Sequence, residues 1–345
     1  MRVFLTGATG FIGRPLAQTL LERGWHITAL VRRPESPEAR VLTQLGVNCI
    51  AGDVTSRDSV ETAMRGTDLV IHNAGHYEYG VDAAGRERMQ AVNVVGTDNV
   101  LSAARALSVA KTVYVSTVAA YGDSGRQPRD ETFVRQAHYR SWYEQTKTEA
   151  HDLALRYQRD GMPLVVVCPN GVMGPNDHSV WGYTLRLYLN RLKPPVSWSP
   201  KSVFSLVEIN DLVRGVVLAA ERGRDGETYL LCGEPRSFAE HLGLWELKPG
   251  AFRVRTYLPP AVMASLFAPL EPLQRRLGLP AFMSRETTWS AAANTYYLSD
   301  KAKRELGWQH QSAKEMWAKT IDGELELLKR RQKRDLVSRL KPLEV

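Results

Sequence analysis

The chain has 345 residues, of which 43% are hydrophobic, and its formal net charge is +8. This composition indicates a globular protein with a buried core in one large domain or two smaller ones. Seven Lys or Arg residues and two acidic residues fall between Lys329 and Val345, so most of the excess charge is C-terminal and does not indicate a nucleic-acid-binding face. Cys49, Cys168 and Cys232 have no paired spacing, which argues against a zinc ribbon or a disulfide framework.

The first 33 residues predict a strand, a glycine turn, a helix and a second strand. Gly7 permits a tight turn, Gly10 lets the main chain approach a diphosphate, and Gly13 lets the helix pack closely on the strand. The helix N-terminus can then hold the anion. We therefore expect a dinucleotide site in this turn, formed by Gly7, Thr9, Gly10, Phe11, Ile12 and Gly13.

The second strand, residues 27–31, ends in Arg32 and Arg33 instead of an acidic residue. An Asp or Glu there would favour NAD, whereas a guanidinium can pair with the 2′-phosphate of NADP. The alternative is a pair of solvated surface arginines. We expect NADP(H) to be preferred and NAD(H) to remain possible.

Two further predicted strands, residues 47–51 and 69–72, also lead into candidate cofactor contacts. After the first, Asp53 beside Val54 is placed to accept from the adenine amine or to serve as a turn carboxylate. After the second, the small residues Asn73, Ala74 and Gly75 leave room for the cofactor at the carboxyl edge of the sheet. His72 and His76 lack ligand partners at metal spacing, so we expect a packed strand histidine and a pocket-wall histidine.

A long helix is expected at residues 83–108, with apolar positions for a core face and a dimer surface. The next strand, 112–116, delivers Thr117 to the carboxyl edge of the sheet. Tyr143 and Lys147 follow at i and i+4 in a helix predicted at 138–159, so they share a face and the ammonium can lower the pKa of the phenol.

Tyr297 and Lys301 have the same spacing as Tyr143 and Lys147. Ser299 and Asp300 stand between them as a helix cap, so we expect these two side chains to lie apart.

The sixth strand, residues 164–168, ends at Pro169, and the chain then leaves the sheet. The stretch up to Pro200 is aromatic and predicts either a pocket wall or a satellite core, with Trp181, Tyr183, Tyr188 and Trp198. We expect 203–207 to return as a strand and 228–231 to form another. Short helices of residues 233–308 would close over the substrate.

The domains expected are a dinucleotide-binding domain of residues 1–168, to which 203–232 return, and a substrate lobe of 169–202 and 233–310. Residues 311–345 are expected to form a helix and a basic tail, for which a solvated terminal helix is favoured over contact with a membrane surface. The fingerprint begins at residue 6 and the longest uncharged run, Thr256 to Leu270, is short and rich in proline. We therefore expect a cytoplasmic protein without an integral membrane segment.

Gly7, Gly10, Gly13, Asp53, Thr117, Tyr143 and Lys147 together resemble the extended short-chain dehydrogenases/reductases of the epimerase/dehydratase family, over about residues 1 to 325. The resemblance implies an α/β fold with a Rossmann-type doubly wound parallel sheet and a smaller, mostly C-terminal substrate lobe. It also implies that the nicotinamide carries the hydride while Thr117, Tyr143 and Lys147 handle the proton. The lysine would reach the nicotinamide ribose as well, and related folds form homodimers.

Several residues differ from the patterns of related subfamilies, and these differences narrow the choice of function. Val118 and Ala119 stand where nucleotide-sugar dehydratases have Asp and Glu, and Gly171 stands where epimerases commonly place Asn. With Pro169 and Arg32, the chain is most similar to the dihydroflavonol-4-reductase and 3β-hydroxysteroid dehydrogenase branch. We expect an NADP-dependent oxidoreductase acting on a ketone, an aldehyde or the matching secondary alcohol. A nucleotide-sugar epimerase and a non-catalytic NADP-sensing regulator are the alternatives, and the sequence identifies no substrate.

Overall fold

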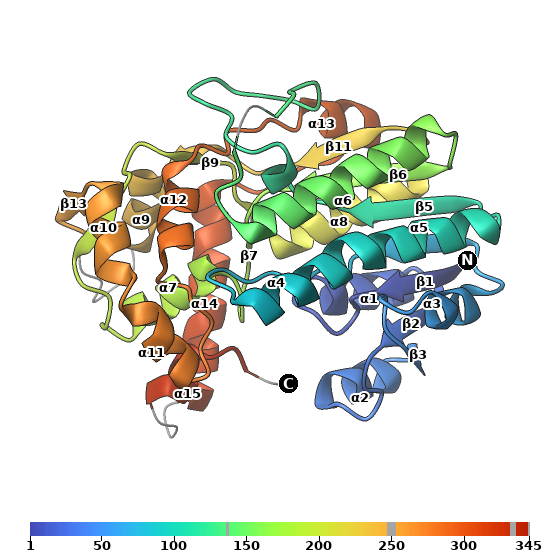
Figure 1. Cartoon of the computed structure of the whole chain (residues 1–345), viewed down its shortest axis with the longest axis horizontal. Coiled ribbons are helices and arrows are strands. Elements are labelled where there is room, and N and C mark those ends of the chain that lie inside the picture. Colours follow the sequence, from blue (N-terminus) through green and yellow to red (C-terminus); the bar gives the residue numbers. More distant parts are fainter. Residues whose placement is uncertain (136–137, 247–252, 332–335, 344–345) are drawn as a thin grey trace.

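A computed structural model describes residues 1–135, 138–246, 253–331 and 336–343. Its centre is a seven-stranded sheet in which every pairing is parallel, in the order β11-β6-β5-β4-β1-β2-β3 (Figure 1). The strands are β1 (Arg2–Thr6), β2 (His26–Val31), β3 (Asn48–Ala51), β4 (Leu69–His72), β5 (Lys111–Val115), β6 (Leu164–Pro169) and β11 (Thr228–Leu231). The order reverses beside β1, so the expected doubly wound Rossmann-type sheet is confirmed.

Helices cover both faces of this sheet, because successive strand residues point to opposite sides. On β1, Val3 and Leu5 pack in one core and Phe4 in the other. The first core is closed by α1 (Gly13–Glu22), α2 (Pro37–Gln44), α8 (Ile209–Arg222) and α13 (Asp300–Leu306). The second is closed by α3 (Arg57–Met64), α5 (Gly96–Ala106) and α6 (Trp142–Arg159). Both faces being buried explains why the strands are continuous apolar runs.

The long helix expected at 83–108 is interrupted. It consists of α4 (Ala83–Gln90), a π-helical turn, η1 (Ala91–Val95), and α5. The helix expected at 138–159 begins later, at Trp142, because the Ser141 side chain accepts the backbone N–H of Glu144 and caps the first turn. The loop from β5 to α6, which begins with the short 3-10 helix η2 (Val118–Ala120), is correspondingly longer.

The rest of the chain forms a lobe with its own aromatic core, on the left of Figure 1. Trp181, Tyr188 and Trp198 belong to this core and Tyr183 to a small neighbouring cluster, so the satellite-core alternative is confirmed. The elements are β7 (Val172–Met173), α7 (Val180–Leu189), β8 (Val196–Trp198), β9 (Val203–Phe204), β10 (Val207–Glu208), β12 (Arg236–Ser237), α9 (Phe238–Trp245), β13 (Thr256–Leu258), α10 (Pro260–Phe267), α11 (Leu270–Arg276) and α12 (Arg285–Ala292).

The prediction of a single strand over residues 203–207 was wrong. The segment forms β9 and β10, which pair with β12 and β7 outside the seven-stranded sheet. Phe204 and Leu206 are buried in the lobe core, whereas Val207 packs in the core of the sheet. The segment therefore passes from one hydrophobic core to the other. Of the two returning segments, only 228–231 joins the main sheet, as β11.

The C-terminal helix is anchored, contrary to the solvated helix that the sequence favoured. α14 (Ala313–Arg331) buries Met316, Trp317 and Ile321 in the lobe core. Its Glu324 carboxylate lies 3.1 Å from the Arg186 guanidinium, and both side chains are fully buried. Arg186 Nε also donates to the carbonyl of Leu340 in α15 (Leu336–Leu340). Parts of the basic tail, 332–335 and 344–345, lie outside the described residues.

Among the described helices, none is both long enough and apolar enough to cross a membrane.

Candidate active site

The turn between β1 and α1 has the close backbone packing that its glycines predicted. Gly7 has a φ of +72°, and a Cβ there would stand 2.8 Å from the backbone nitrogen of Ala74. A Cβ on Gly13 would stand 1.9 Å from the Gly7 carbonyl oxygen, so no side chain fits between turn and helix. The Gly10 N–H donates to the same oxygen at 3.1 Å. The turn is therefore tight and presents backbone at its outer surface.

The N-terminus of α1 fits an anionic ligand such as a cofactor diphosphate. No side chain caps it and its first turn holds no acidic residue, whereas α2 and α3 are capped by Ser36 and Ser56. The buried Nε of Arg14, in the first turn of α1, has no hydrogen-bond partner in the described part of the chain. Exposed Gly10 and half-buried Thr9, Phe11 and Ile12 border this end of the helix. The helix dipole and a guanidinium together suit a diphosphate.

The residues expected around the adenosine are placed at the ends of β2 and β3. Arg32 and Arg33 are exposed, and neither side chain has an ion pair within the described ranges. Asp53 Oδ1 accepts from both the N–H and the hydroxyl of Thr55 at 2.9 Å, which makes it a turn carboxylate. With its second carboxylate oxygen, Asp53 can still accept a hydrogen bond from the adenine amine. Val54 is buried against Gly96.

The Asn73–Gly75 turn after β4 is tied to the glycine turn. The Thr6 hydroxyl accepts the backbone N–H groups of Asn73 and Ala74 at 3.2 and 3.1 Å. Asn73 Nδ2 lies 3.4 Å from the Gly7 carbonyl. A Cβ on Gly75 would stand 4.0 Å from Lys147 Nζ, which places the carboxyl end of β4 beside the candidate catalytic helix. The structure thus brings three separate sequence segments to one edge of the sheet.

Lys147 is buried on α6, but its hydrogen bonds differ from the expectation. Its Nζ donates to the Tyr114 hydroxyl at 3.2 Å and to the Val115 carbonyl at 3.5 Å. The ammonium also lies over the Tyr114 ring, 5.1 Å from its centroid. Tyr114, on β5, is therefore a partner that the sequence did not reveal. A residue of a central strand points into the core by default, and nothing local marks this one as a lysine ligand.

Tyr143 and Thr117 meet above that lysine. Burial raises the pKa of Tyr143 to about 12, while the Lys147 charge and the interaction with the Thr117 hydroxyl lower it. The Thr117 oxygen accepts the Ala119 N–H at 3.2 Å, which leaves its own proton to donate. The expected electrostatic effect of Lys147 is present, but the larger effect of burial keeps the phenol protonated at neutral pH.

Two more tyrosines, absent from the expected site, pack on Tyr143. The Tyr77 ring meets the Tyr143 ring edge to face with centroids 4.8 Å apart, and Tyr79 lies 6.2 Å away. They come from the loop after β4, where His76 also pairs with Glu78. Alternating tyrosines at 77 and 79, directly after the small-residue turn, are a signal that sequence reasoning missed.

Asn93 in the π-helical turn is a second missed residue. It is buried, accepts the His76 N–H at 2.7 Å, and donates to the His76 carbonyl and the Thr146 hydroxyl at 3.0 Å. Thr146 in turn donates to the Tyr143 carbonyl. Asn93 therefore joins the loop after β4 to the start of α6. A polar residue between Val92 and Val94 in an apolar helix is the signal that could have found it.

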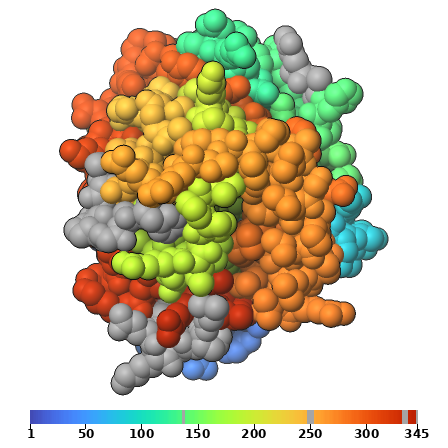
Figure 2. Space-filling view, turned by 90° about the vertical axis from the view of Figure 1, so that its left-hand side faces the viewer, coloured from blue at the N-terminus to red at the C-terminus, as the bar shows by residue number. Residues whose placement is uncertain are grey.

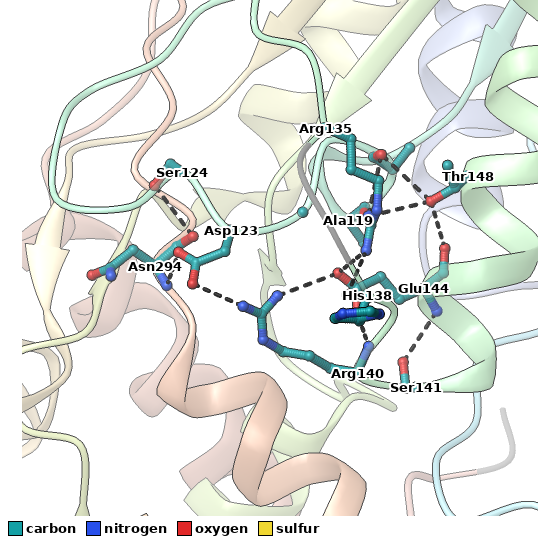
Figure 3. Close-up of polar contacts among 12 residues, drawn as sticks. Ala119, Asp123, Ser124, Arg135, His138, Arg140, Ser141, Glu144, Thr148 and Asn294 are labelled. Atoms are coloured by element: carbon teal, nitrogen blue, oxygen red, sulfur yellow. Dashed lines mark hydrogen bonds and ion pairs between the residues drawn. The ribbon is translucent and has the colours of Figure 1, made fainter.

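The loop from β5 to α6 is held by an arginine clamp, drawn in Figure 3. Arg135 Nη1 donates to the Ala119 carbonyl at 2.9 Å, and Nη2 donates to Glu144 Oε1 at 2.7 Å. Glu144 Oε2 accepts the Arg140 N–H, and the Arg140 guanidinium reaches Asp123 at 2.8 Å. Because Ala119 follows Thr117 and Glu144 follows Tyr143, the clamp joins the two segments that carry the candidate catalytic side chains.

The remaining candidates are placed as follows. Tyr297 donates to the Gly122 carbonyl and Lys301 pairs with Glu227, so the second Tyr–Lys pair lies apart, as expected. Pro169, also expected at the cofactor, is buried at the end of β6 and pairs with Leu231.

Comparison with known families identifies the family of the chain. The model of the NAD dependent epimerase/dehydratase family matches residues 3–232, which include the glycine turn and the Thr117, Tyr143 and Lys147 positions. The chain belongs to this family. It is therefore an enzyme of the extended short-chain dehydrogenase/reductase type, as the sequence motifs predicted.

Two relatives of this chain have names that describe them as reductases. A putative dihydroflavonol 4-reductase of Synechocystis is 29% identical over 326 residues, 92% of this chain and 93% of the relative. A 4-hydroxy-2-methyl-3-oxo-4-farnesyl-3,4-dihydroquinoline-1-oxide ketoreductase of Stigmatella aurantiaca is 30% identical over 322 residues, 89% and 92% of the two chains. The crystal structure of gox2253 superposes with a TM-score of 0.78 at 28% identity and covers 94% of this chain and 98% of that one.

Proposed function

We propose that this enzyme is an NADP(H)-dependent oxidoreductase that reduces a ketone or aldehyde, or oxidises the matching secondary alcohol. The observation that carries the proposal is the meeting of Thr117 and Tyr143 above the buried Lys147, beside the Asn73–Gly75 turn. A proton donor, a hydrogen-bond donor and a buried cation at the carboxyl edge of the sheet are the groups that a carbonyl oxygen needs when it is reduced.

Different residues of the site would bind the cofactor, orient the substrate and transfer the proton. The glycine turn, the N-terminus of α1 and Arg14 would hold the diphosphate, and when bound the nicotinamide supplies or accepts the hydride. The Thr117 hydroxyl would orient the substrate oxygen with the proton that Ala119 leaves free. Tyr143 would give its phenolic proton to that oxygen, and the Lys147 ammonium would stabilise the resulting phenolate.

The environment of Tyr143 suits a residue that holds a proton in the free enzyme. A pKa of about 12 keeps the phenol protonated at neutral pH, so the residue is ready to act as an acid. The side chains of Tyr77 and Tyr79 beside it add apolar ring surface, which suits a substrate with an apolar body around its carbonyl group.

One position, Gly171, argues against the alternative function as a nucleotide-sugar epimerase. A Cβ on Gly171 would stand 2.7 Å from Leu206 Cδ2, so the asparagine that epimerases commonly place there would need Leu206 to move. The regulator alternative predicts cofactor binding without turnover, so the same experiment separates it from the oxidoreductase.

The decisive experiment measures NADPH oxidation by the purified protein with a panel of apolar ketones and aldehydes. We expect turnover with at least one of them, and a loss of ~10²-fold or more in Tyr143→Phe with nearly unchanged NADPH affinity. Tyr157→Phe, on the same helix and bonded to Asp98, is the matched control and should keep full activity. A Tyr143→Phe enzyme with more than about a tenth of wild-type turnover would contradict the assignment.

A further inference from the structure

The outer side of α10 and α11 exposes an unusual amount of apolar surface. Of the fourteen large apolar side chains that are exposed in the described part of the chain, six lie within residues 257–289. Three of them lie in these two helices and Leu277 directly follows α11; the four residues Val262, Leu266, Leu273 and Leu277 are called here the outer stripe. Leu266 and Leu273 are the most exposed of the four, at 54% and 52%. Clustered exposure of this kind marks an interaction surface.

The outer stripe lies on one side of a nearly continuous helix. Ala268 and Pro269, which separate α10 from α11, both have right-handed helical backbone angles. The four stripe residues are spaced by four, seven and four positions, which keeps side chains on one helix face. Met263 and Gln274, which directly follow Val262 and Leu273 in the sequence, are buried in the lobe. The helix is therefore apolar on its solvent side as well as on its core side.

A tryptophan widens the apolar surface. Trp289 is exposed on α12, the helix that packs directly against α10. Figure 2 views this side of the molecule, where the orange surface of α10 to α12 covers much of the face. Tryptophan is favoured at boundaries between apolar and aqueous media, since its ring is apolar and its N–H is polar.

The charge around the stripe is mostly positive. Residues 253–289 contain five arginines and two glutamates, and all five arginines are exposed. Both glutamates are half-buried and engaged: Glu271 accepts the Arg285 N–H, and Glu286 accepts the Gly80 N–H. Within the described residues, Arg276 and Arg285 have no ion pair. An apolar strip flanked by unpaired arginines complements a surface that is apolar inside and anionic outside.

The same helices touch the candidate active site. The Arg275 guanidinium donates to the Gly80 carbonyl, and Gly80 N–H binds Glu286 at 2.6 Å. Gly80 ends the short loop whose Tyr77 and Tyr79 pack on Tyr143. A surface bound to the outer stripe would thus lie next to the loop that covers the proposed proton donor.

We propose that the outer stripe and its arginines form a peripheral docking face for anionic lipid bilayers, with the leucines at the level of the acyl chains and the arginines at the headgroups. The face adjoins the C-terminal segment, because a Cβ on Gly278 would stand 3.1 Å from Lys341 Nζ. Docking there needs no helix that crosses the membrane, and it would place the active-site loop close to apolar compounds dissolved in the bilayer.

Sedimentation of the full chain with vesicles tests this. We expect binding to vesicles of phosphatidylglycerol and phosphatidylcholine, weaker binding to phosphatidylcholine alone, and weaker binding at high salt. Leu266→Ser with Leu273→Ser should lower the partition coefficient by about tenfold or more, and Arg276→Ser by about fivefold. The controls are Leu45→Ser, at a residue 45% exposed beside α2 on the other side of the molecule, and Arg40→Ser on α2. Both should bind like the wild type.

Three outcomes would overturn the proposal. They are a wild-type chain that stays in the supernatant, a double variant that binds as well as the wild type, and an oligomer in vesicle-free buffer that the double variant alone dissociates. The last result would assign the face to a second copy of the chain. Unchanged NADPH affinity verifies that the variants fold. Vesicle binding is measured without substrate, so it succeeds or fails separately from the proposed turnover.

Discussion

The pKa of Tyr143 is determined by two opposing effects. Its burial disfavours the phenolate, whereas the Lys147 charge 4 residues along the same helix favours it. Lys147 is held in place by Tyr114 and the Val115 carbonyl, so its charge stays fixed beneath the site. The phenol is therefore protonated before reaction, and its conjugate base has a cation nearby when the proton leaves.

Cofactor choice is a second property decided by single residues. We expect tighter binding of NADPH than of NADH, because Arg32 and Arg33 are exposed at the end of β2 where a carboxylate would select NAD. One charge-assisted hydrogen bond contributes ~1.5 to 3 kcal/mol, or roughly 10- to 150-fold in affinity. Fluorescence titration of both cofactors against Arg32→Ala and Arg33→Ala measures it, with Arg40→Ala as a control. Equal dissociation constants for the two cofactors in the wild type would mean that the arginines are surface charges only.

At the scale of elements, the arginine clamp sets the position of the loop between β5 and α6. Arg135 and Glu144 are each about nine-tenths buried, so their ion pair is poorly screened. Arg135 additionally bonds the Ala119 and Ala120 carbonyls, at 2.9 and 3.3 Å. Without this side chain, two carbonyls and a buried carboxylate lose a partner at the same time.

Replacing Arg135 with Gln should therefore destabilise the protein by about 3 kcal/mol, in the range for a buried ion pair that loses one partner. Turnover should also fall, because Thr117 and Tyr143 adjoin the two ends of the clamp. Urea unfolding measures the first effect and NADPH oxidation the second. Arg57→Gln removes an exposed i,i+4 pair with Glu61 and should leave the stability nearly unchanged, because solvent screens the pair. Equal losses in the two variants would show that the clamp has no special role.

The sequence predicted those elements whose signal is local. Residues 69–72 and 228–231 became β4 and β11 with the expected bounds, since buried parallel strands are apolar runs. Local sequence patterns did not predict the structure where it depends on contacts between residues that are distant in the sequence. Residues 203–207 divide between two cores, Arg135 depends on the closure of a long loop, and α14 is held by Arg186, far back in the chain.

At the scale of the whole molecule, the expected homodimer stays a prediction. α5 and α6 lie side by side over one face of the sheet in Figure 1, and Val95 at the start of α5 is exposed. Pairing of these helices between two copies would cover that surface. We expect light scattering at micromolar concentration to give twice the 38.7 kDa chain mass, and Val95→Arg to weaken the dimer. The control is Leu45→Arg, and a monomeric wild type would rule the dimer out.

Stability as a function of pH is the last property of the whole fold that we predict. His72, His151 and His241 are buried, and desolvation lowers their pKa values from 6.5 to about 3, about 4 and about 4. The folded state keeps them neutral where the unfolded chain protonates them. Their contribution is thus complete above pH ~6.5 and is lost as the pH falls, by ~1.4 kcal/mol per group and pH unit.

Buried carboxyl groups act in the opposite direction, and Asp177 is an example. Burial raises the pKa of Asp177 from 3.8 to about 6, so its contribution to stability increases as the pH falls from ~6 to ~4. The same balance includes His178, whose pKa burial lowers to about 4, and Glu131, Asp152 and Glu208, whose pKa values burial raises. We therefore predict how single substitutions change the stability that is lost on acidification. Urea unfolding at about pH 7 and about pH 5 measures the loss. His241→Gln should make the loss of stability with falling pH smaller, and Asp177→Asn should make it larger. A pH dependence that neither substitution changes would contradict these two assignments.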